Sequence, residues 1–199
     1  VTQALKTVLM EFNLPQEQLL EIIDGMEMDL QQTRYPDFKA LSLYCYRVAS
    51  VVGLLAAEIF GYTDRQTQKY AHDLGMAFQL TNIIRDVGED ARRGRVYLPI
   101  DELKRFDVPL SDILDSRYTE NFRQLMEFQI ERAEQYYVQA MAQLPSVDRK
   151  SQRPGLVMAA IYRTVLEEIK RDNCRVLTHR TSLTPLRKLW IAWRTWIKG

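Results

Sequence analysis

The sequence is poor in the residues that interrupt helices and lacks the pattern that builds sheets. Its 199 residues include only eight glycines and seven prolines, and apolar and polar residues show no sustained alternation. Because such alternation marks half-buried strands, its absence argues against a β-rich fold. A chain of this length with 46% hydrophobic residues fits one domain, or most of one, with a substantial core.

Cysteine, net charge and long apolar runs are also scarce. The only two cysteines, Cys45 and Cys174, lie far apart, which excludes a disulfide framework and a metal-binding spacing and favours a reducing cytoplasm. The net charge of +1 argues against a nucleic-acid binder. The longest apolar run, residues 48–57, is interrupted by Ser50 and is shorter than the roughly 20 residues that span a bilayer.

Helical periodicity and capping residues predict an all-α fold, organised as one bundle of long helices. Pro15 suits the first turn of a helix, Gly61 suits the end of one, and Thr63 with Asp64 can cap the next. Residues 1–12 have the pattern of a helix already under way. The other expected helices cover about residues 15–32, 38–60, 64–90, 101–105, 116–144 and 154–177, and a last one begins at Pro185.

One face of the helix expected over residues 64–90 carries amides and carboxylates. At about 100° per residue, four polar side chains fall within an arc of roughly 80°; they are Gln79, Asn82, Asp86 and Asp90. Two carboxylates one turn apart can share a hard divalent cation such as Mg²⁺, and such a cation can hold a diphosphate. The alternative is a solvated face with an ordinary acid pair. Apolar neighbours on the same helix place this polar face toward the interior of the bundle. Buried polar groups need partners, and this favours a ligand.

The same face extends backwards through Gly75 to His72. A glycine inside a helix costs about 1 kcal/mol relative to alanine. Gly75 therefore predicts the close approach of a ligand or of another helix.

Four arginines surround the two carboxylates: Arg85, Arg92, Arg93 and Arg95. Mg²⁺, a diphosphate and flanking arginines would together balance the charge of the acid pair. A helix C-terminus decorated with favourable cations explains the arginines equally well.

Small side chains recur every four residues at Cys45, Ala49 and Gly53, and they make a narrow groove on one helix. Such a groove either lets a second helix approach closely or leaves room for a slender apolar ligand. Close packing is the favoured interpretation.

Basic residues and tryptophans gather at the C-terminal end. From residue 170 onward the only acid is Asp172, and the basic residues are Lys170, Arg171, Arg175, Arg180, Arg187, Lys188, Arg194 and Lys198. The three tryptophans of the chain, Trp190, Trp193 and Trp196, recur here at three-residue spacing. This mixture is typical of helices that lie in a membrane interface. A terminal helix packed on the bundle, with an exposed basic face, is the equal alternative.

Several of these segments, taken in order, resemble the motifs of squalene and phytoene synthases. The run from Gln79 to Pro99 is similar to the family's second aspartate-rich motif, and Tyr44 to Gly53 looks like its tyrosine motif. The residues after Tyr162 resemble its late helix. Within the family, residues 25–29 and 86–90 look most like the bacterial hopanoid-pathway branch, the presqualene diphosphate synthases.

The resemblance implies the isoprenoid synthase helical bundle and a head-to-head prenyl transferase. Such an enzyme would join two farnesyl diphosphates into presqualene diphosphate, toward squalene or hopanoids, with Mg²⁺ drawing off one diphosphate and with no NADPH needed for this first step. Asp86 and Asp90 would hold Mg²⁺, and Tyr44 or Tyr162 would lie near the carbocation or the departing proton. The expected substrate-binding residues are Gln79, Asn82, Arg85, Arg95, Cys45, Ala49, Gly53 and Gly75.

The resemblance also implies a first aspartate-rich motif, for which this chain offers no candidate. We therefore expect residues 1–199 to be a single domain of this family that is N-terminally incomplete, with its N-terminal helices missing. We also expect this stretch alone not to turn over farnesyl diphosphate.

Two alternatives stay open. One is a phytoene synthase acting on geranylgeranyl diphosphate. The other is a non-catalytic, membrane-associated assembly factor of the same fold, which would not need the acid pair and the amides present here. The expected partners are prenyl diphosphates and, through the C-terminal helix, the inner face of the cytoplasmic membrane, with no role for nucleic acid.

Overall fold

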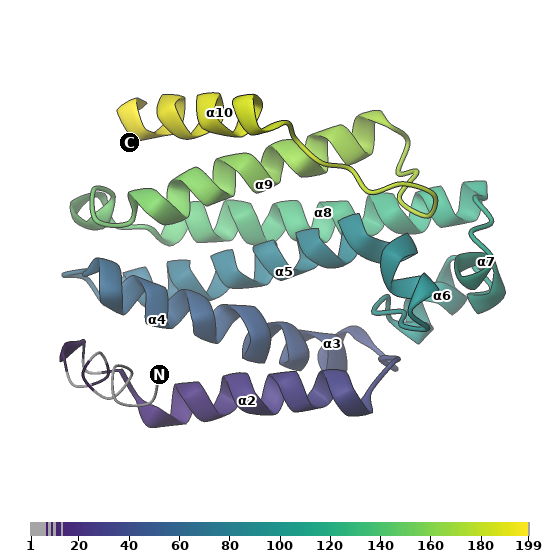
Figure 1. Cartoon of the computed structure of the whole chain (residues 1–199), viewed down its shortest axis with the longest axis horizontal. Coiled ribbons are helices and arrows are strands. Elements are labelled where there is room, and N and C mark those ends of the chain that lie inside the picture. The colour runs from purple at the N-terminus through teal and green to yellow at the C-terminus, as the bar shows by residue number, and fades with distance from the viewer. Residues whose placement is uncertain (1–6, 8, 10, 13, 199) are drawn as a thin grey trace.

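Helices dominate the part of the chain that the structure describes, which is residues 7, 9, 11–12 and 14–198 of a computed structural model (Figure 1). The expected all-α class is confirmed, and the helix expected over residues 1–12 lies mostly outside the described residues. The elements are α2 (Gln16–Gln31), α3 (Phe38–Cys45), η1 (Tyr46–Ser50), α4 (Val51–Phe60), α5 (Gln66–Arg92), α6 (Ile100–Arg105), α7 (Leu110–Leu114), α8 (Glu120–Gln143), η2 (Ser146–Asp148), α9 (Arg153–Arg171) and α10 (Pro185–Lys198).

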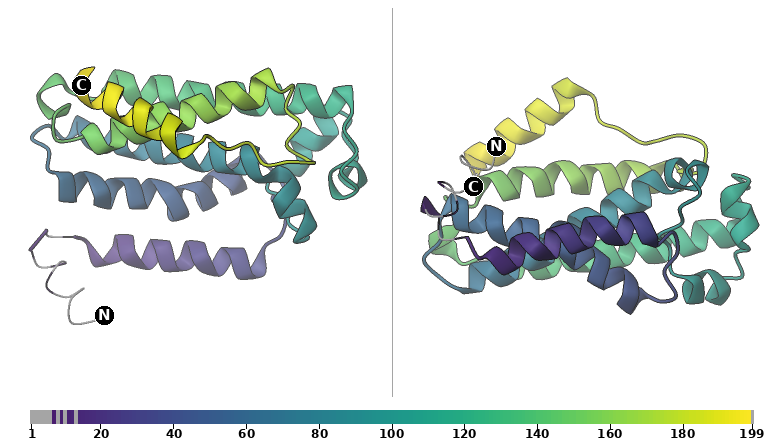
Figure 2. Two further views of the ribbon diagram at one scale, coloured as in Figure 1. Left: turned by 45° about the horizontal axis from the view of Figure 1, so that its top comes forward. Right: turned by 60° about the horizontal axis from the view of Figure 1, so that its bottom comes forward.

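Helix α5 runs through the middle of the bundle. It packs against α8, against η1 and α4, and against α9, whereas α2 and α10 lie at opposite edges (Figures 1 and 2). The N-terminus of α5 is held by Asp148, whose buried carboxylate accepts hydrogen bonds from the backbone N–H groups of Thr63 and Asp64 and from the Thr67 hydroxyl. Burial alone would raise the pKa of Asp148, but these bonds outweigh it and lower the pKa to about 2.

The apolar helix expected over residues 38–60 forms as α3, η1 and α4 in series, with a π-helical turn at η1. Asp37 caps it by accepting a 2.8 Å hydrogen bond from the Ala40 N–H, and Gly61, at φ 79°, ends it. By length and hydropathy these 23 residues could cross a membrane, which the apolar run of residues 48–57 taken alone does not indicate. Their position is that of a core helix, because they pack between α2 and α5.

Glycines bring this helix and α5 into close contact. A Cβ atom at Gly75 would lie 2.6 Å from Ser50 Cα, and one at Gly53 would lie 2.6 Å from the Ala71 carbonyl oxygen. Neither contact could accommodate a side chain without moving a backbone. The close-packing interpretation of the small-residue groove is therefore confirmed.

Two helix boundaries differ from the prediction, and α7 was not predicted. Helix α9 ends at Arg171 rather than near Leu177, because Asn173 and Cys174 adopt φ of 52° and 58°, which a right-handed helix cannot contain. Helix α8 begins at Glu120, where the Thr119 hydroxyl accepts a hydrogen bond from the Phe122 N–H.

The segment that follows α9 folds back directly onto α5. The Gly88 N–H donates a 3.2 Å hydrogen bond to the Val176 carbonyl, and a Cβ at Gly88 would lie 2.6 Å from the Leu177 carbonyl carbon. Arg92 also donates to the Leu177 carbonyl. Gly88 thus lets residues 176 and 177 pack directly on α5, and a few residues further on the Arg180 side chain reaches Asp86.

Candidate active site

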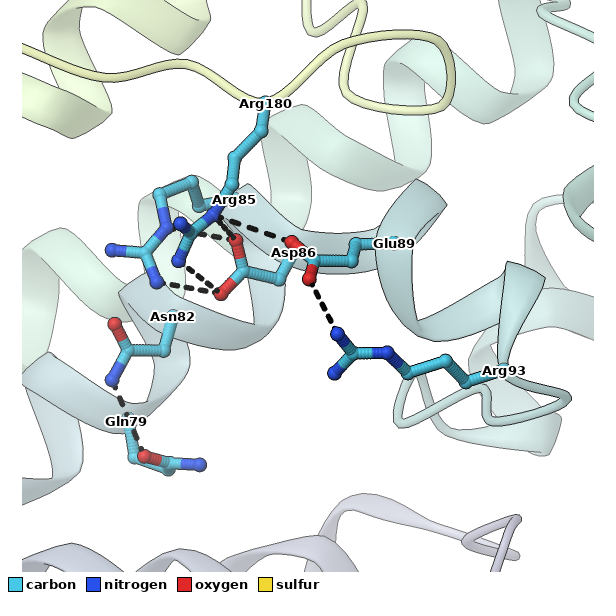
Figure 3. Close-up of polar contacts among 7 residues, drawn as sticks. All are labelled: Gln79, Asn82, Arg85, Asp86, Glu89, Arg93 and Arg180. Atoms are coloured by element: carbon cyan, nitrogen blue, oxygen red, sulfur yellow. Dashed lines mark hydrogen bonds and ion pairs between the residues drawn. The ribbon is translucent and has the colours of Figure 1, made fainter.

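A cavity of about 270 Å³ lies between α4, α5 and α9. Its walls are mainly apolar, and Gln79 and Asn82 supply polar groups on α5, with their side chains hydrogen-bonded to each other (Figure 3). Of the residues predicted to bind or act on substrate, those that line the cavity are Ala49, Gly53, Gly75, Gln79, Asn82 and Tyr162. The close approach at Gly53 and Gly75 therefore shapes the cavity as well as the helix packing.

Asp86 is enclosed by two guanidinium groups (Figure 3). Arg85 donates to its two oxygens at 2.8 and 2.5 Å, and Arg180 donates to the same two oxygens at 2.6 and 3.3 Å. Burial alone would raise the pKa of Asp86, but the hydrogen bonds from Arg85 and Arg180 hold it below its ordinary value. Asp86 is therefore a carboxylate whose charge is already neutralised.

Asp90, one turn further along α5, is neutralised by no guanidinium in the described part of the chain. Its carboxylate makes no hydrogen bond or ion pair with any residue that the structure describes, whereas its neighbour Glu89 pairs with Arg93 and Arg180. Burial, followed by the negative charge of Asp86, raises the pKa of Asp90 to about 6. A half-buried carboxylate that lacks a partner is a favourable place for a cation.

Arg180 is a site residue that the sequence did not reveal. In the sequence Arg180 is one of the many cations of the C-terminal end. In the structure its guanidinium donates hydrogen bonds to Asp86, 94 positions away in the chain. The residue spacing contains no signal for this contact. It depends on the end of α9 at Arg171 and on the close approach at Gly88.

Tyr44, a predicted catalytic residue, does not line the cavity. Its hydroxyl donates a 3.1 Å hydrogen bond to Asp29 Oδ2, and the Tyr97 hydroxyl donates a 2.6 Å bond to Asp29 Oδ1. Burial and then the hydrogen bond to Asp29 raise the pKa of Tyr97 to about 12. Asp29, on α2, entered the sequence analysis only through the family resemblance of residues 25–29, and in the structure it accepts hydrogen bonds from both phenols.

Arg95 belongs to the same network. Its guanidinium donates a 2.9 Å hydrogen bond to the Asp29 carbonyl, and the residue shares a tight hollow with Asp90 and Tyr97. The predicted role of Arg95 in binding the substrate stays a prediction. Its position beside Asp90 is consistent with that role.

Two other residues on the predicted faces point elsewhere. Cys45 is fully buried and does not line the cavity, because it packs in the core. His72 pairs with Asp73, contacts the Tyr46 ring and does not line the cavity.

The residues present fit a magnesium ion. Carboxylate and amide oxygens are the donors that Mg²⁺ prefers, and the ion commonly completes its shell with waters and substrate phosphates. Asn82 Oδ1 is buried and has no hydrogen-bond partner among the described residues, which makes it an available oxygen near Asp86 and Asp90. No cluster of three or more His, Cys, Asp or Glu side chains suited to a metal occurs in the described part of the chain. The site thus offers a partial set of ligands.

The all-α bundle around a central helix and an apolar cavity is an isoprenoid synthase fold of the squalene synthase type, by its similarity to solved structures. Solved structures support this class. The dehydrosqualene synthase crystal structure superimposes with a TM-score of 0.82 and 27% identity over 96% of this chain and 68% of that one. Squalene synthase HpnC from Alicyclobacillus acidocaldarius gives a TM-score of 0.77 and 25% identity over 86% of this chain and 65% of that one.

The chain belongs to the squalene/phytoene synthase family, whose characteristic sequence it matches over residues 1–187. It is 38% identical to the phytoene synthase of Arthrospira platensis over 95% of this chain and 65% of that protein. It is 35% identical to the 15-cis-phytoene synthase of Synechocystis over 98% of this chain and 62% of that protein. The chain thus spans less than two thirds of the length of these relatives.

The contrast between the two carboxylates predicts opposite effects on stability. In metal-free protein at pH 8, Asp90→Asn should raise the free energy of unfolding by roughly 1–2 kcal/mol, because it removes a partly buried, unpaired charge. The folded pKa of about 6 lies above the ordinary 3.8, so the gain should disappear as the pH falls below both values. Asp86→Asn should destabilise at pH 8, because two guanidiniums lose their partner. Chemical unfolding in EDTA at pH 8 and pH 3 tests this, and destabilisation by Asp90→Asn at pH 8 would contradict it.

The tyrosine network predicts a contrast between two neighbouring rings, Tyr97 and Tyr35, whose centroids are 5.8 Å apart. Tyr97→Phe should destabilise the protein by about 1–2 kcal/mol, because Asp29 loses a hydrogen bond. Tyr35→Phe is the matched control and should be neutral or stabilising, because its buried hydroxyl has no partner among the described residues. Equal losses in urea unfolding would show that Asp29 does not hold Tyr97.

Proposed function

We propose that the protein is a Mg²⁺-dependent head-to-head prenyl transferase that joins two farnesyl diphosphates into presqualene diphosphate. The observation that carries the proposal is the position of Asp86 and Asp90, next to the amides that line an apolar cavity. Because the chain spans less than two thirds of its relatives, the activity is proposed for the whole protein.

Charge governs the polar end of the proposed site. Mg²⁺, when bound, would neutralise the leaving diphosphate, and Asp86, Asp90 and the free Asn82 oxygen would hold it. A cation at Asp86 would release Arg85 and Arg180, whose guanidiniums could then bind phosphate oxygens. The two arginines would thus exchange one anion for another.

The apolar end would hold the prenyl chain and exclude water. The small residues Ala49, Gly53 and Gly75 are part of the wall of the cavity that would receive the chain, and Tyr162 packs against Phe78 on the same wall. In the proposed reaction the first substrate loses diphosphate with its bonding electrons, and the double bond of the second attacks the resulting carbocation. Loss of a proton then closes the cyclopropane, and Tyr162, on the cavity wall, is the candidate near these steps, whereas Tyr44 lies outside the cavity. Exclusion of water protects the carbocation.

Phytoene synthesis from geranylgeranyl diphosphate is the second candidate, and the names of the curated relatives favour it. Both reactions would use the same diphosphate site and differ in the length of the chain that the cavity holds. The presence of Asp86, Asp90, Gln79 and Asn82 argues against a non-catalytic assembly factor.

Product analysis tests the proposal. The whole protein with Mg²⁺ should convert farnesyl diphosphate to presqualene diphosphate, and Asp90→Asn should lower kcat by about a hundredfold or more, as expected when a ligand that stabilises a leaving group is lost. Asp115→Asn is the control, because Asp115 forms only a surface ion pair with Arg117, and it should retain full activity. Turnover of geranylgeranyl diphosphate alone would select the second candidate.

A different result would reject both enzymatic candidates. If neither diphosphate is consumed, and a non-hydrolysable farnesyl analogue with Mg²⁺ leaves the melting temperature unchanged, the assembly-factor alternative is favoured.

A further inference from the structure

Helix α10 exposes an unusual number of large apolar side chains. Six of them are 52–79% exposed, and they are Leu186, Leu189, Trp190, Trp193, Trp196 and Ile197. At about 100° per residue all six fall within an arc of roughly 120°. They therefore form one continuous surface along the helix, which we call the α10 apolar face.

Most of the α10 apolar face points away from the rest of the protein; at its two borders Trp190 lines the groove against α9, and the Trp196 ring lies 5.5 Å from the Arg153 guanidinium of α9. Ile191, which is buried, and Thr195, which is half-buried, lie on the opposite side of the helix and pack toward α9. Figure 2 shows α10 as the outer helix beside α9. A surface helix normally turns its apolar stripe toward the core. The orientation of α10 is the reverse, so packing within the bundle does not account for its sequence.

Positive charge borders the α10 apolar face. The helix contains no acidic residue, and Arg187 and Arg194 lie on one flank. With Arg149 they line a groove of about 500 Å³ between α9 and α10, which also contains Glu167 and Trp190. Arg187 pairs with Glu168, whereas Arg194 is held over the Trp190 ring at 5.2 Å. The charged side chains thus lie beside the exposed indoles.

We propose that α10 binds flat on an anionic membrane, with the α10 apolar face in the interface and its arginines on the lipid phosphates. Apolar aromatic residues bordered by Arg and Lys suit that boundary. The helix is about 21 Å long, too short to cross a hydrocarbon core of about 30 Å. A second copy of this chain is a less suitable partner for the α10 apolar face, because a dimer through this face would bring the positive charges of the two α10 helices close together.

The proposal also gives the protein a location. The cytoplasmic leaflet carries the anionic lipids that attract basic segments. A peripheral position at the inner face of the cytoplasmic membrane follows. This inference does not depend on the proposed reaction, because it rests on the orientation and charge of α10.

Intrinsic fluorescence provides a test, because the three tryptophans within residues 1–199 all lie on α10. Vesicles of phosphatidylcholine mixed with phosphatidylglycerol should bind the whole protein in sedimentation and shift tryptophan emission to shorter wavelength. Vesicles of phosphatidylcholine alone should bind more weakly. Leu186→Gln should weaken vesicle binding about tenfold. Arg194→Gln should weaken binding to the anionic vesicles about fivefold and leave binding to phosphatidylcholine vesicles unchanged.

Leu30→Gln is the matched control. Leu30 is 83% exposed on α2, compared with 79% for Leu186, so the two changes are similar in chemistry and differ in place. Leu30→Gln should bind like the unmodified protein. Absence of binding and of an emission shift on both vesicles would overturn the proposal, as would equal weakening by the two leucine changes. Self-association in lipid-free buffer that Leu186→Gln abolishes, without vesicle binding, would assign the face to a second copy instead.

Discussion

The repulsion between Asp86 and Asp90, one turn apart on the central helix, is the constraint around which the site is organised. Two negative charges at this spacing, partly removed from water, need compensating cations. Arg85 and Arg180 neutralise Asp86, whereas Asp90 has no such partner among the described residues and its pKa rises to about 6. The protein thus holds one neutralised carboxylate beside one that remains available for a cation.

Close backbone contacts on two faces of α5 make this arrangement possible. Gly75 admits η1 and so shapes the cavity, while Gly88 admits the segment after α9 and so places Arg180. The α5 residues that line the cavity and the charged residues of α5 therefore lie on adjacent parts of one helix. A diphosphate bound to the charged groups would leave its hydrocarbon chain free to enter the cavity, and this is the requirement of prenyl transfer.

Local patterns predicted the fold and half of the site, and long-range contacts could not be predicted in this way. Helical spacing identified the amides and carboxylates, because they share one element. Arg180 and Asp29 reach the site from distant segments, and no periodicity encodes such contacts. The predicted end of α9 near Leu177 was also wrong, because the positive φ at Asn173 ends the helix earlier. The composition of α10 fits a membrane helix or a packed one, and only its orientation in the structure supplies the argument on which the membrane proposal rests.

The most direct test of the central claim measures how tightly the whole protein binds Mn²⁺, a spectroscopic substitute for Mg²⁺, in the presence of inorganic pyrophosphate. Electron paramagnetic resonance monitors the binding. The account predicts saturable Mn²⁺ binding that requires pyrophosphate and that Asp90→Asn weakens at least tenfold, because two carboxylates share the ion. Unchanged Mn²⁺ affinity in Asp90→Asn would show that the acid pair on α5 does not hold the metal.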